Sequence, residues 1–137
     1  MKIKLFKNGI VPIRKHEEDG GLDILLPEDL IIRPCEHEKV GLGFGVQIPH
    51  GYVGQLVPRS SIANQGLSVY TCLIDEGYTG EVFLLCQNNT MHCLKYSKGD
   101  RICSLVVTKI CDDKEIEIVN EFPMTDRGDG CLGSSGK

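Results

Sequence analysis

The sequence lacks any apolar run that approaches the roughly 20 residues of a membrane-spanning helix. Its start, from Met1 to Leu5, alternates between apolar and basic side chains and has no apolar block of the kind that marks a signal peptide. Heptads, internal repeats and low-complexity tracts are also missing. We therefore expect no membrane partner and an intracellular protein of the cytoplasm, or of the nucleus if the source is eukaryotic.

Clusters of basic residues are missing as well. The 15 lysines and arginines are outnumbered by 19 acids, which gives a formal net charge of −4 at pH 7. Broad affinity for a phosphate backbone needs clustered Lys and Arg, so we expect no nucleic-acid partner. An anionic ligand must then be held locally, by single arginines such as Arg59 and Arg127.

Close cysteine pairs are the third absence. Seven cysteines occur in 137 residues, an odd number with no Cys-x-x-Cys spacing, so a disulfide framework is not expected. A metal site built from Cys86, His92 and Cys93 competes with reduced, mostly buried thiols. The thiols are favoured, because His92 and Cys93 as neighbours on a strand would point to opposite faces.

The chain does contain a series of short β-type runs separated by turn residues. With 41% apolar residues it can form one domain with a modest core. The spacing predicts an all-β sandwich or barrel, with Ser60 to Gln65 as a short helical turn. The expected strands are Ile3 to Phe6, Leu22 to Leu26, Leu30 to Ile32, Glu38 to Ile48, Tyr52 to Val57, Leu67 to Leu73, Glu81 to Gln87, Arg101 to Ile110 and Glu115 to Val119.

Glycine and serine crowd the last dozen residues, from Asp126 to Lys137. Such a stretch has no apolar core of its own and many backbone NH groups. We expect a domain over residues 1–125 and a flexible arm over residues 126–137 that closes over a ligand.

The turn within Leu73 to Glu81 carries the clearest chemical signal. It places the Asp75 carboxylate and the Tyr78 ring three residues apart, beside two glycines and between two apolar runs. A carboxylate fixed next to a ring is suited to aim one water at one substrate. The turn therefore predicts a catalytic acid.

Three further motifs are ambiguous by themselves. In Pro58 to Ala63 the serines favour helix N-capping, yet the same NH groups, hydroxyls and arginine would also make an anion pocket. Asp23 enters a strand after two glycines and is consistent with solvated surface. Asp100 and Arg101 are consistent with a surface ion pair worth about 0 to 1 kcal/mol.

Taken in order, five segments resemble the motifs of the trimeric deoxyuridine triphosphatase (dUTPase) family, and together they span nearly the whole chain. The segments are Gly21-Leu22-Asp23-Ile24, Pro58-Arg59-Ser60-Ser61, Leu73-Ile74-Asp75-Glu76-Gly77-Tyr78, Gly99-Asp100-Arg101-Ile102 and the tail that begins Arg127-Gly128.

The resemblance implies a distorted jelly roll, or β-clip-like barrel, that forms a homotrimer with three active sites at subunit boundaries and a flexible C-terminal arm. It implies hydrolysis of dUTP to dUMP and pyrophosphate, which limits uracil incorporation into DNA and supplies dUMP for thymidylate synthesis. The implied cofactor is Mg²⁺, held through substrate phosphates and waters without a direct protein ligand.

At the matching positions, the resemblance implies that Asp75 orients and deprotonates the attacking water and that Tyr78 packs on the deoxyribose. Arg59 and Ser60 bind phosphate, and Asp23 is a supporting acid near the metal-bound phosphates. Asp75, Asp23, Arg59 and Ser60 are thus the implied catalytic residues. The implied substrate-binding residues are Arg59, Ser60, Ser61, Val69, Cys72, Leu73, Ile74, Asp75, Tyr78, Phe83, Ser104, Arg127, Leu132, Gly133 and Ser134.

Selectivity is expected from the turn between Leu67 and Ile74, whose backbone can pair with the uracil edge. Three positions depart from the family pattern: Ser104 replaces a frequent glutamine, Leu132 a common aromatic and Cys72 a usual glycine. These changes affect a polar contact, ring stacking over the base and the backbone geometry of the hairpin. The catalytic acid is kept.

Two alternatives stay open. A dCTP deaminase shares the fold and the Arg-Ser-Ser pattern, but it needs a glutamate in the strand after the aspartate turn. This chain has Leu85 at that position and carries Glu81 only at the start of the strand. The other alternative is a non-catalytic nucleotide-binding module that regulates a partner protein. The presence of both Asp75 and the arm favours an enzyme.

Overall fold

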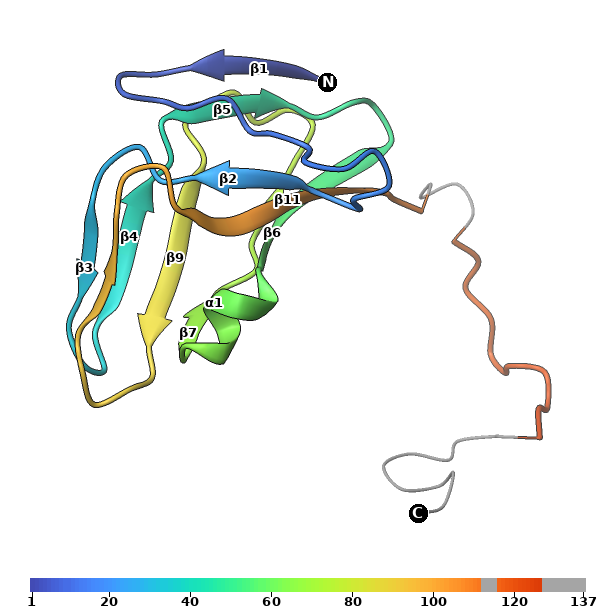
Figure 1. Cartoon of the computed structure of the whole chain (residues 1–137). Coiled ribbons are helices and arrows are strands. Elements are labelled where there is room, and N and C mark those ends of the chain that lie inside the picture. Colours follow the sequence, from blue (N-terminus) through green and yellow to red (C-terminus); the bar gives the residue numbers. More distant parts are fainter. Residues whose placement is uncertain (112–115, 127–137) are drawn as a thin grey trace.

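The computed structural model describes residues 1–111 and 116–126. Short strands dominate it and one short helix interrupts them (Figure 1). The elements are β1 (Lys2–Leu5), β2 (Leu22–Leu25), β3 (Leu30–Ile32), β4 (His37–Gly41), β5 (Phe44–Gln47), β6 (Tyr52–Pro58), α1 (Ser60–Asn64), β7 (Leu67–Val69), β8 (Leu73–Ile74), β9 (Phe83–Asn88), β10 (Leu94–Tyr96) and β11 (Arg101–Lys109).

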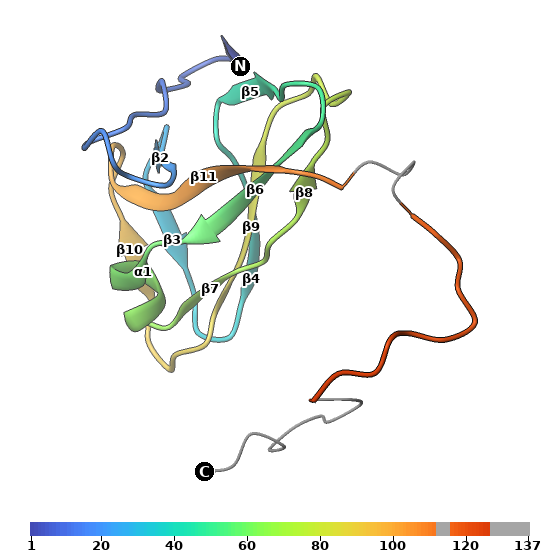
Figure 2. The ribbon, with the colours of Figure 1, turned by 90° about the vertical axis from the view of Figure 1, so that its right-hand side faces the viewer.

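The strands pair in four small antiparallel sheets (Figures 1 and 2). The largest has the order β2-β11-β6-β8, and a second has the order β4-β9-β7. The pairs β1-β5 and β10-β3 complete the fold. Neighbours such as β2 and β11 are far apart in sequence, so the connections cross between sheets as in a jelly roll. The predicted all-β jelly-roll class is confirmed.

Alternation along the strands separates a core face from an outer face. In β9, Leu84, Cys86 and Asn88 are buried, whereas Phe83 and Leu85 lie on the opposite face. This division leaves an apolar outer surface on β9 that is available to line a cavity. The largest fully buried apolar side chains come from several strands and connections: Phe44, Ile24, Leu26, Ile32, Leu42, Leu67, Leu84, Ile102 and Leu105.

Asn88 is the buried polar side chain of the described core. Its Nδ2 donates to the carbonyl oxygens of Ile32, Arg33 and His92 at 3.0, 3.1 and 2.8 Å. Its Oδ1 accepts hydrogen bonds from the backbone NH and the hydroxyl of Thr90 at 2.9 and 2.7 Å. The amide therefore joins β3 to the turn between β9 and β10 with all its polar atoms satisfied.

Some predicted strands differ from those observed. The run from Glu38 to Ile48 is two strands, because Gly43 adopts φ +69° and interrupts the extended backbone. The run from Leu67 to Leu73 is likewise divided between β7 and β8. The three-residue β10 was not predicted, since so short a run carries little periodic signal.

The segment over residues 116–126 runs away from the sheets (Figures 1 and 2). The predicted strand is wrong for residues 116–119, which form none in the structure. A strand needs a neighbour for its backbone hydrogen bonds, and this segment follows the edge of no sheet in the described chain. Its apolar side chains face solvent, with Phe122 88% and Met124 102% exposed. The predicted arm lies outside the described residues, apart from Asp126.

Burial also differs from expectation among the cysteines. Cys86 and Cys103 are buried, and burial raises their pKa values to about 11 and about 12, so both thiols stay neutral. The expectation of mostly buried thiols is wrong, because the other described cysteines lie in turns or at strand ends. These exposed residues are Cys35, Cys72, Cys93 and Cys111.

No helix in the described part of the chain is long and apolar enough to cross a membrane.

Candidate active site

The turn after β8 holds the predicted acid. Ile74 is buried at the end of β8, and the next residue, Asp75, is exposed. The backbone NH of Tyr78 donates to the Asp75 carbonyl oxygen at 3.0 Å, which closes the turn. The structure therefore brings the predicted carboxylate and phenol together on one tight turn.

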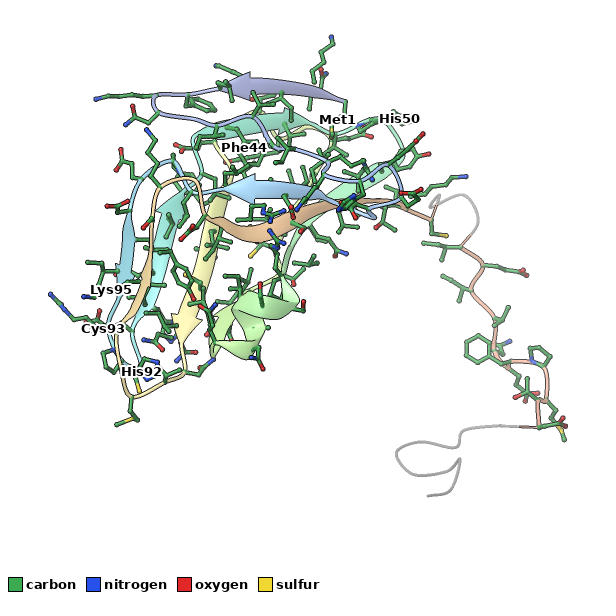
Figure 3. The ribbon with its side chains drawn as sticks, in the orientation of Figure 1. Met1, Phe44, His50, His92, Cys93 and Lys95 are labelled. Atoms are coloured by element: carbon green, nitrogen blue, oxygen red, sulfur yellow. The ribbon has the colours of Figure 1, made fainter. Side chains whose placement is uncertain are left out.

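Glu76 ties this turn to the loop between β5 and β6. Its carboxylate accepts a hydrogen bond from the Gly51 NH at 3.0 Å and lies 3.1 Å from His50 Nδ1. These contacts hold the pKa of the Glu76 carboxyl below its usual value, and the contact with His50 contributes most. Figure 3 shows His50 on that loop. Neither His50 nor Glu76 was predicted as a site residue. The position of Glu76 directly after Asp75 in the sequence was a signal that could have identified it.

A cavity of about 380 Å³ opens beside the turn, a volume within the usual range for small-molecule sites. Five predicted substrate-binding residues line it: Cys72, Leu73, Ile74, Tyr78 and Phe83. Val69, which was also predicted, is not part of the lining. The unpredicted lining residues are Lys39, Leu56, Tyr70, Glu81, Val82 and Leu85.

The Tyr78 ring has a fixed place in the cavity wall. Its hydroxyl donates to the Glu81 carbonyl oxygen at 2.7 Å, while 42% of the residue is exposed. Gly80 lies against the phenol so closely that a Cβ there would be 2.5 Å from the Tyr78 oxygen. The second glycine of the motif is therefore required by packing, and the ring keeps an open surface for a ligand.

A second cluster surrounds Asp23 on β2. Its Oδ2 lies 2.9 Å from an Arg101 nitrogen and 3.4 Å from an Arg59 nitrogen, and its Oδ1 accepts a hydrogen bond from the Ser104 hydroxyl at 3.3 Å. The Asp23 side chain is only 14% exposed. A cavity of about 350 Å³ is lined by these four residues, and Lys15 and His16 are among its other walls.

This cluster corrects two expectations. Arg101 does not pair with Asp100 at the surface. It reaches Asp23 across the β2-β11 pairing, while Asp100 accepts a hydrogen bond from the Ser97 NH at 2.8 Å. Asp23 is likewise no solvated surface acid, because it holds two guanidinium groups in place. Two positive charges beside one shared carboxylate form a site that favours an anion.

The motif at the start of α1 supplies hydroxyls but no helix cap. Arg59 occupies the N-cap position, and no side chain makes a capping hydrogen bond there. The N-capping role considered for the serines is therefore wrong. Ser60 and Ser61 are exposed beside Arg59, and Ser61 and Arg59 help to line a further cavity of about 370 Å³. Their hydroxyls remain available to a ligand.

The two clusters lie toward opposite ends of β6. Strand β8 pairs with β6 through Gly54 and Ile74, and continuing this register places Asp75 beside Val53. Arg59 follows the other end of β6, about six residues further on, which corresponds to about 20 Å at roughly 3.3 Å per residue. The Asp75 carboxylate and the Arg59 guanidinium of one chain therefore cannot act on the same phosphate group.

The fold and the two clusters define an all-β protein with a mostly apolar cavity for a ring and an arginine site for an anion. The family model for dUTPase matches residues 7–136. The deoxyuridine 5'-triphosphate nucleotidohydrolase of Tropheryma whipplei (strain Twist) is 35% identical over 137 residues, covering 97% of this chain and 93% of the relative. The chain belongs to the dUTPase family.

Solved structures agree with this assignment. The dUTPase of Staphylococcus bacteriophage 80alpha with dUPNHPP has a TM-score of 0.89 at 30% identity, covering 99% of this chain and 98% of that one. A variant of the dUTPase from phage phi11 of S. aureus, whose structure shows the coordination of a structural Mg(II) ion, has a TM-score of 0.79 at 27% identity. That match covers 88% of this chain and 97% of the phage chain.

Four predicted substrate-binding residues belong to the arm. Arg127, Leu132, Gly133 and Ser134 lie outside the described residues. Within residues 1–111 and 116–126, no group of three or more His, Cys, Asp or Glu side chains is arranged to hold a metal ion. The alternative metal site is thus not formed, and Figure 3 shows two of its members, His92 and Cys93, at an outer corner of the fold.

Proposed function

We propose that this chain hydrolyses dUTP to dUMP and pyrophosphate, which limits uracil incorporation into DNA and supplies dUMP for thymidylate synthesis. The observation that carries the proposal is the exposed Asp75 carboxylate on a closed turn beside a nucleotide-sized cavity, in a chain of the dUTPase family. Since the substrate is a nucleotide of the cell interior, the proposed location is intracellular, in the cytoplasm.

Asp75 acts as the base in this proposal. Water attack at the innermost phosphorus needs a group that orients the water and accepts its proton, with little further covalent work for the protein. The Asp75 carboxylate is exposed, and within the described part of the chain the residue is tied to the turn through its backbone carbonyl. Its side-chain oxygens therefore remain free to hold water.

The cavity next to the turn takes the nucleoside. Tyr78 offers an open ring surface to the deoxyribose, and Phe83, Leu73 and Ile74 provide apolar walls for the base. The backbone between Leu67 and Ile74 supplies hydrogen bonds to the uracil edge. A ribose, which carries an extra 2'-hydroxyl, would have to displace the Tyr78 ring. That ring is held by the hydrogen bond from its hydroxyl to the Glu81 carbonyl oxygen at 2.7 Å.

Arg59 and its neighbours take the phosphates. The guanidinium groups of Arg59 and Arg101 are aligned by the shared Asp23 carboxylate, so they need little reordering when an anion arrives. Ser60 adds a hydroxyl donor beside Arg59, and Ser104, at the same end of β6, supports Asp23 by donating its hydroxyl to Oδ1. The proposed role of Asp23 is therefore to position two arginines as well as to stand near the phosphates.

The donor chemistry of this cluster fits Mg²⁺ bound through the substrate. Both oxygens of Asp23 are engaged by protein donors, so phosphate oxygens and waters would hold the ion, with Asp23 as the neighbouring acid. Mg²⁺ bound in this way supplies positive charge to the departing pyrophosphate.

The separation of the two clusters supports a homotrimer with shared sites. Asp75 and Arg59 lie about 20 Å apart along β6, so a complete site needs Asp75 from one subunit and Arg59 from another. A closed threefold ring repeats this contact three times and leaves no half-site unused. We expect the molecular mass of the purified protein, measured by light scattering, to equal three chains.

The domain proposed over residues 1–125 carries both clusters, and the arm over residues 126–137 closes a completed site. Arg127 would add charge at the phosphates, and Leu132, Gly133 and Ser134 would cover the ligand. A chain that ends at Thr125 should therefore fold and trimerise while its turnover falls at least tenfold. Unchanged turnover in the shortened chain contradicts this role of the arm.

The direct test of the activity offers dUTP, dCTP, dTTP and UTP separately to the purified protein with Mg²⁺. Pyrophosphate and ammonia are measured in each reaction. We expect pyrophosphate from dUTP at a rate far above the other three, and no ammonia from dCTP, because Leu85 occupies the position where a deaminase needs its glutamate. Binding of dUTP without pyrophosphate release would overturn the proposal.

A further inference from the structure

The cavity beside the Asp75 turn contains two charged side chains among mostly apolar walls. They are Lys39 from β4 and Glu81 from the segment before β9. A nucleobase needs few polar partners in such a cavity, but those partners decide which base binds. The polar groups of the cavity that are not already hydrogen-bonded within the protein therefore indicate which base the cavity can bind.

Most of the polar side chains in the cavity already have partners. The Tyr70 hydroxyl donates to Gln87 Oε1 at 2.6 Å, and the Tyr78 hydroxyl donates to the Glu81 carbonyl oxygen at 2.7 Å. The Glu81 carboxylate accepts a hydrogen bond from the Gly43 NH at 2.8 Å. These three groups are positioned by the protein and have limited capacity left for a ligand.

Lys39 differs from them. It pairs with Leu85 in the β4-β9 register, and its Nζ lies 4.2 Å from the centre of the Phe83 ring. Within residues 1–111 and 116–126 the ammonium makes this cation–π contact and no hydrogen bond. An ammonium carries three donors and no acceptor, whereas the Cys72 thiol in the same cavity is only a weak donor. Lys39 thus holds strong, unused donors at the wall where the base is proposed to bind.

We propose that Lys39 is a specificity-determining residue that donates a hydrogen bond to the 4-keto oxygen of uracil. This inference rests on the proposed function for the identity of the base. The contact with Phe83 restricts the lysine side chain and keeps its charge over the apolar wall. The donor is then present before the nucleotide binds, which reduces the entropy lost on binding.

The chemistry of the two bases makes the contact selective. Uracil has a keto oxygen at the 4-position, which accepts a hydrogen bond, whereas cytosine has an amino group there. An ammonium cannot accept a hydrogen bond, so cytosine would place its amino donor against the Lys39 donor. Thymine has the same 4-keto oxygen, so Lys39 distinguishes uracil from cytosine and contributes nothing against thymine.

The test uses the full chain with Lys39→Met, which keeps an unbranched apolar stem, and Lys39→Arg, which keeps a cationic donor. Dissociation constants for dUMP and dCMP are measured by titration calorimetry. Loss of a charged hydrogen bond should weaken dUMP binding about 10- to 100-fold in Lys39→Met and leave dCMP binding unchanged or tighter. Lys39→Arg should retain most of the preference for dUMP.

Lys4→Met is the matched control. Its Nζ lies 4.9 Å from the Phe6 ring centre, so it removes a similar cation–π lysine that is absent from the cavity lining. This variant should bind both nucleotides as the wild type does. An unchanged ratio of dUMP to dCMP affinity in Lys39→Met overturns the role of Lys39.

The binding measurement separates this inference from the proposed reaction. Wild-type chain that prefers dUMP through Lys39 but releases no pyrophosphate from dUTP overturns the hydrolysis alone. Hydrolysis of dUTP by the wild type, with base preference intact in Lys39→Met, overturns the lysine contact alone. Wild-type chain that neither binds dUMP nor hydrolyses dUTP overturns both.

Discussion

At the scale of single residues, Asp75 and Asn88 show how similar polar side chains serve different purposes. Asp75 is exposed on a turn, and its carboxylate oxygens have no protein donor among the described residues. Asn88 is completely buried, and its side chain makes five hydrogen bonds. The first arrangement leaves an acid ready for a ligand, and the second fixes the packing of the fold.

Asp75→Asn should separate binding from turnover. The amide occupies the same volume and can still orient water, but it cannot accept a proton, so kcat should fall about 100- to 10,000-fold. Binding of dUTP, measured calorimetrically, and the circular dichroism spectrum should match the wild type. Turnover close to the wild-type value would remove Asp75 from the reaction.

Asn88→Ala should destabilise the fold strongly. The change leaves the buried Ile32 carbonyl oxygen and the partly buried Arg33 and His92 carbonyl oxygens without the Nδ2 donor, and the free energy of unfolding should fall by about 2 to 4 kcal/mol. Asn89→Ala is the matched control, because its exposed Nδ2 makes one bond, to the Ser68 hydroxyl at 2.7 Å. Urea unfolding would show the difference, and equal losses in both variants would contradict the assigned role of Asn88.

At the scale of elements, the β8 turn and the β5-β6 loop behave as one unit through Glu76. Glu76→Ala removes the acceptor for the Gly51 NH and for His50 Nδ1, so the turn that carries Asp75 should become mobile. We expect kcat to fall about threefold to tenfold with little change in KM, since the cavity walls stay in place. Steady-state kinetics with dUTP provides the measurement.

Two variants make this test specific. Glu76→Gln keeps one carbonyl oxygen for the Gly51 NH and should recover most of kcat. His50→Ala removes only the imidazole contact and should have a smaller effect than Glu76→Ala. A Glu76→Ala enzyme that loses stability yet keeps the wild-type kcat would assign Glu76 a purely structural role.

The parts of the site that lie within one turn were predictable from sequence, whereas those that depend on strand pairing were not. The turn with Asp75 and Tyr78 is local, so residue types and spacing were sufficient to identify it. The contact of Arg101 with Asp23 joins residues 78 apart in sequence, and it depends on how β2 pairs with β11. Lys39 enters the cavity wall only because β4 pairs with β9. Long-range register of this kind leaves no periodic signal in one strand.

Considered over the entire chain, the proposed site is divided between the two ends of β6. The cavity and Asp75 lie at one end, while Arg59, Arg101 and Asp23 lie at the other. In the function proposed above, a single chain therefore holds two incomplete sites, which links activity to assembly. The exposed apolar segment over residues 116–126 adds surface that a neighbouring subunit can cover.

Mixing two inactive variants tests this division. Asp75→Asn chains keep an intact arginine cluster, and Arg59→Met chains keep an intact Asp75 turn, so each homotrimer lacks one half of every site. Exchange of subunits after unfolding and refolding an equal mixture should create about a quarter of sites with both halves intact, if subunits combine at random. Pyrophosphate release should therefore reach about a quarter of the wild-type rate per chain.

The control for this mixture combines Asp75→Asn chains with chains that carry both Asp75→Asn and Arg59→Met. No arrangement of these subunits supplies an intact Asp75, so the rate should stay at the level of Asp75→Asn alone. Recovery in the first mixture and not in the control requires one chain to donate the carboxylate and another the guanidinium. If size measurement confirms mixed trimers and the first mixture still stays inactive, Asp75 and Arg59 do not complete each other's sites.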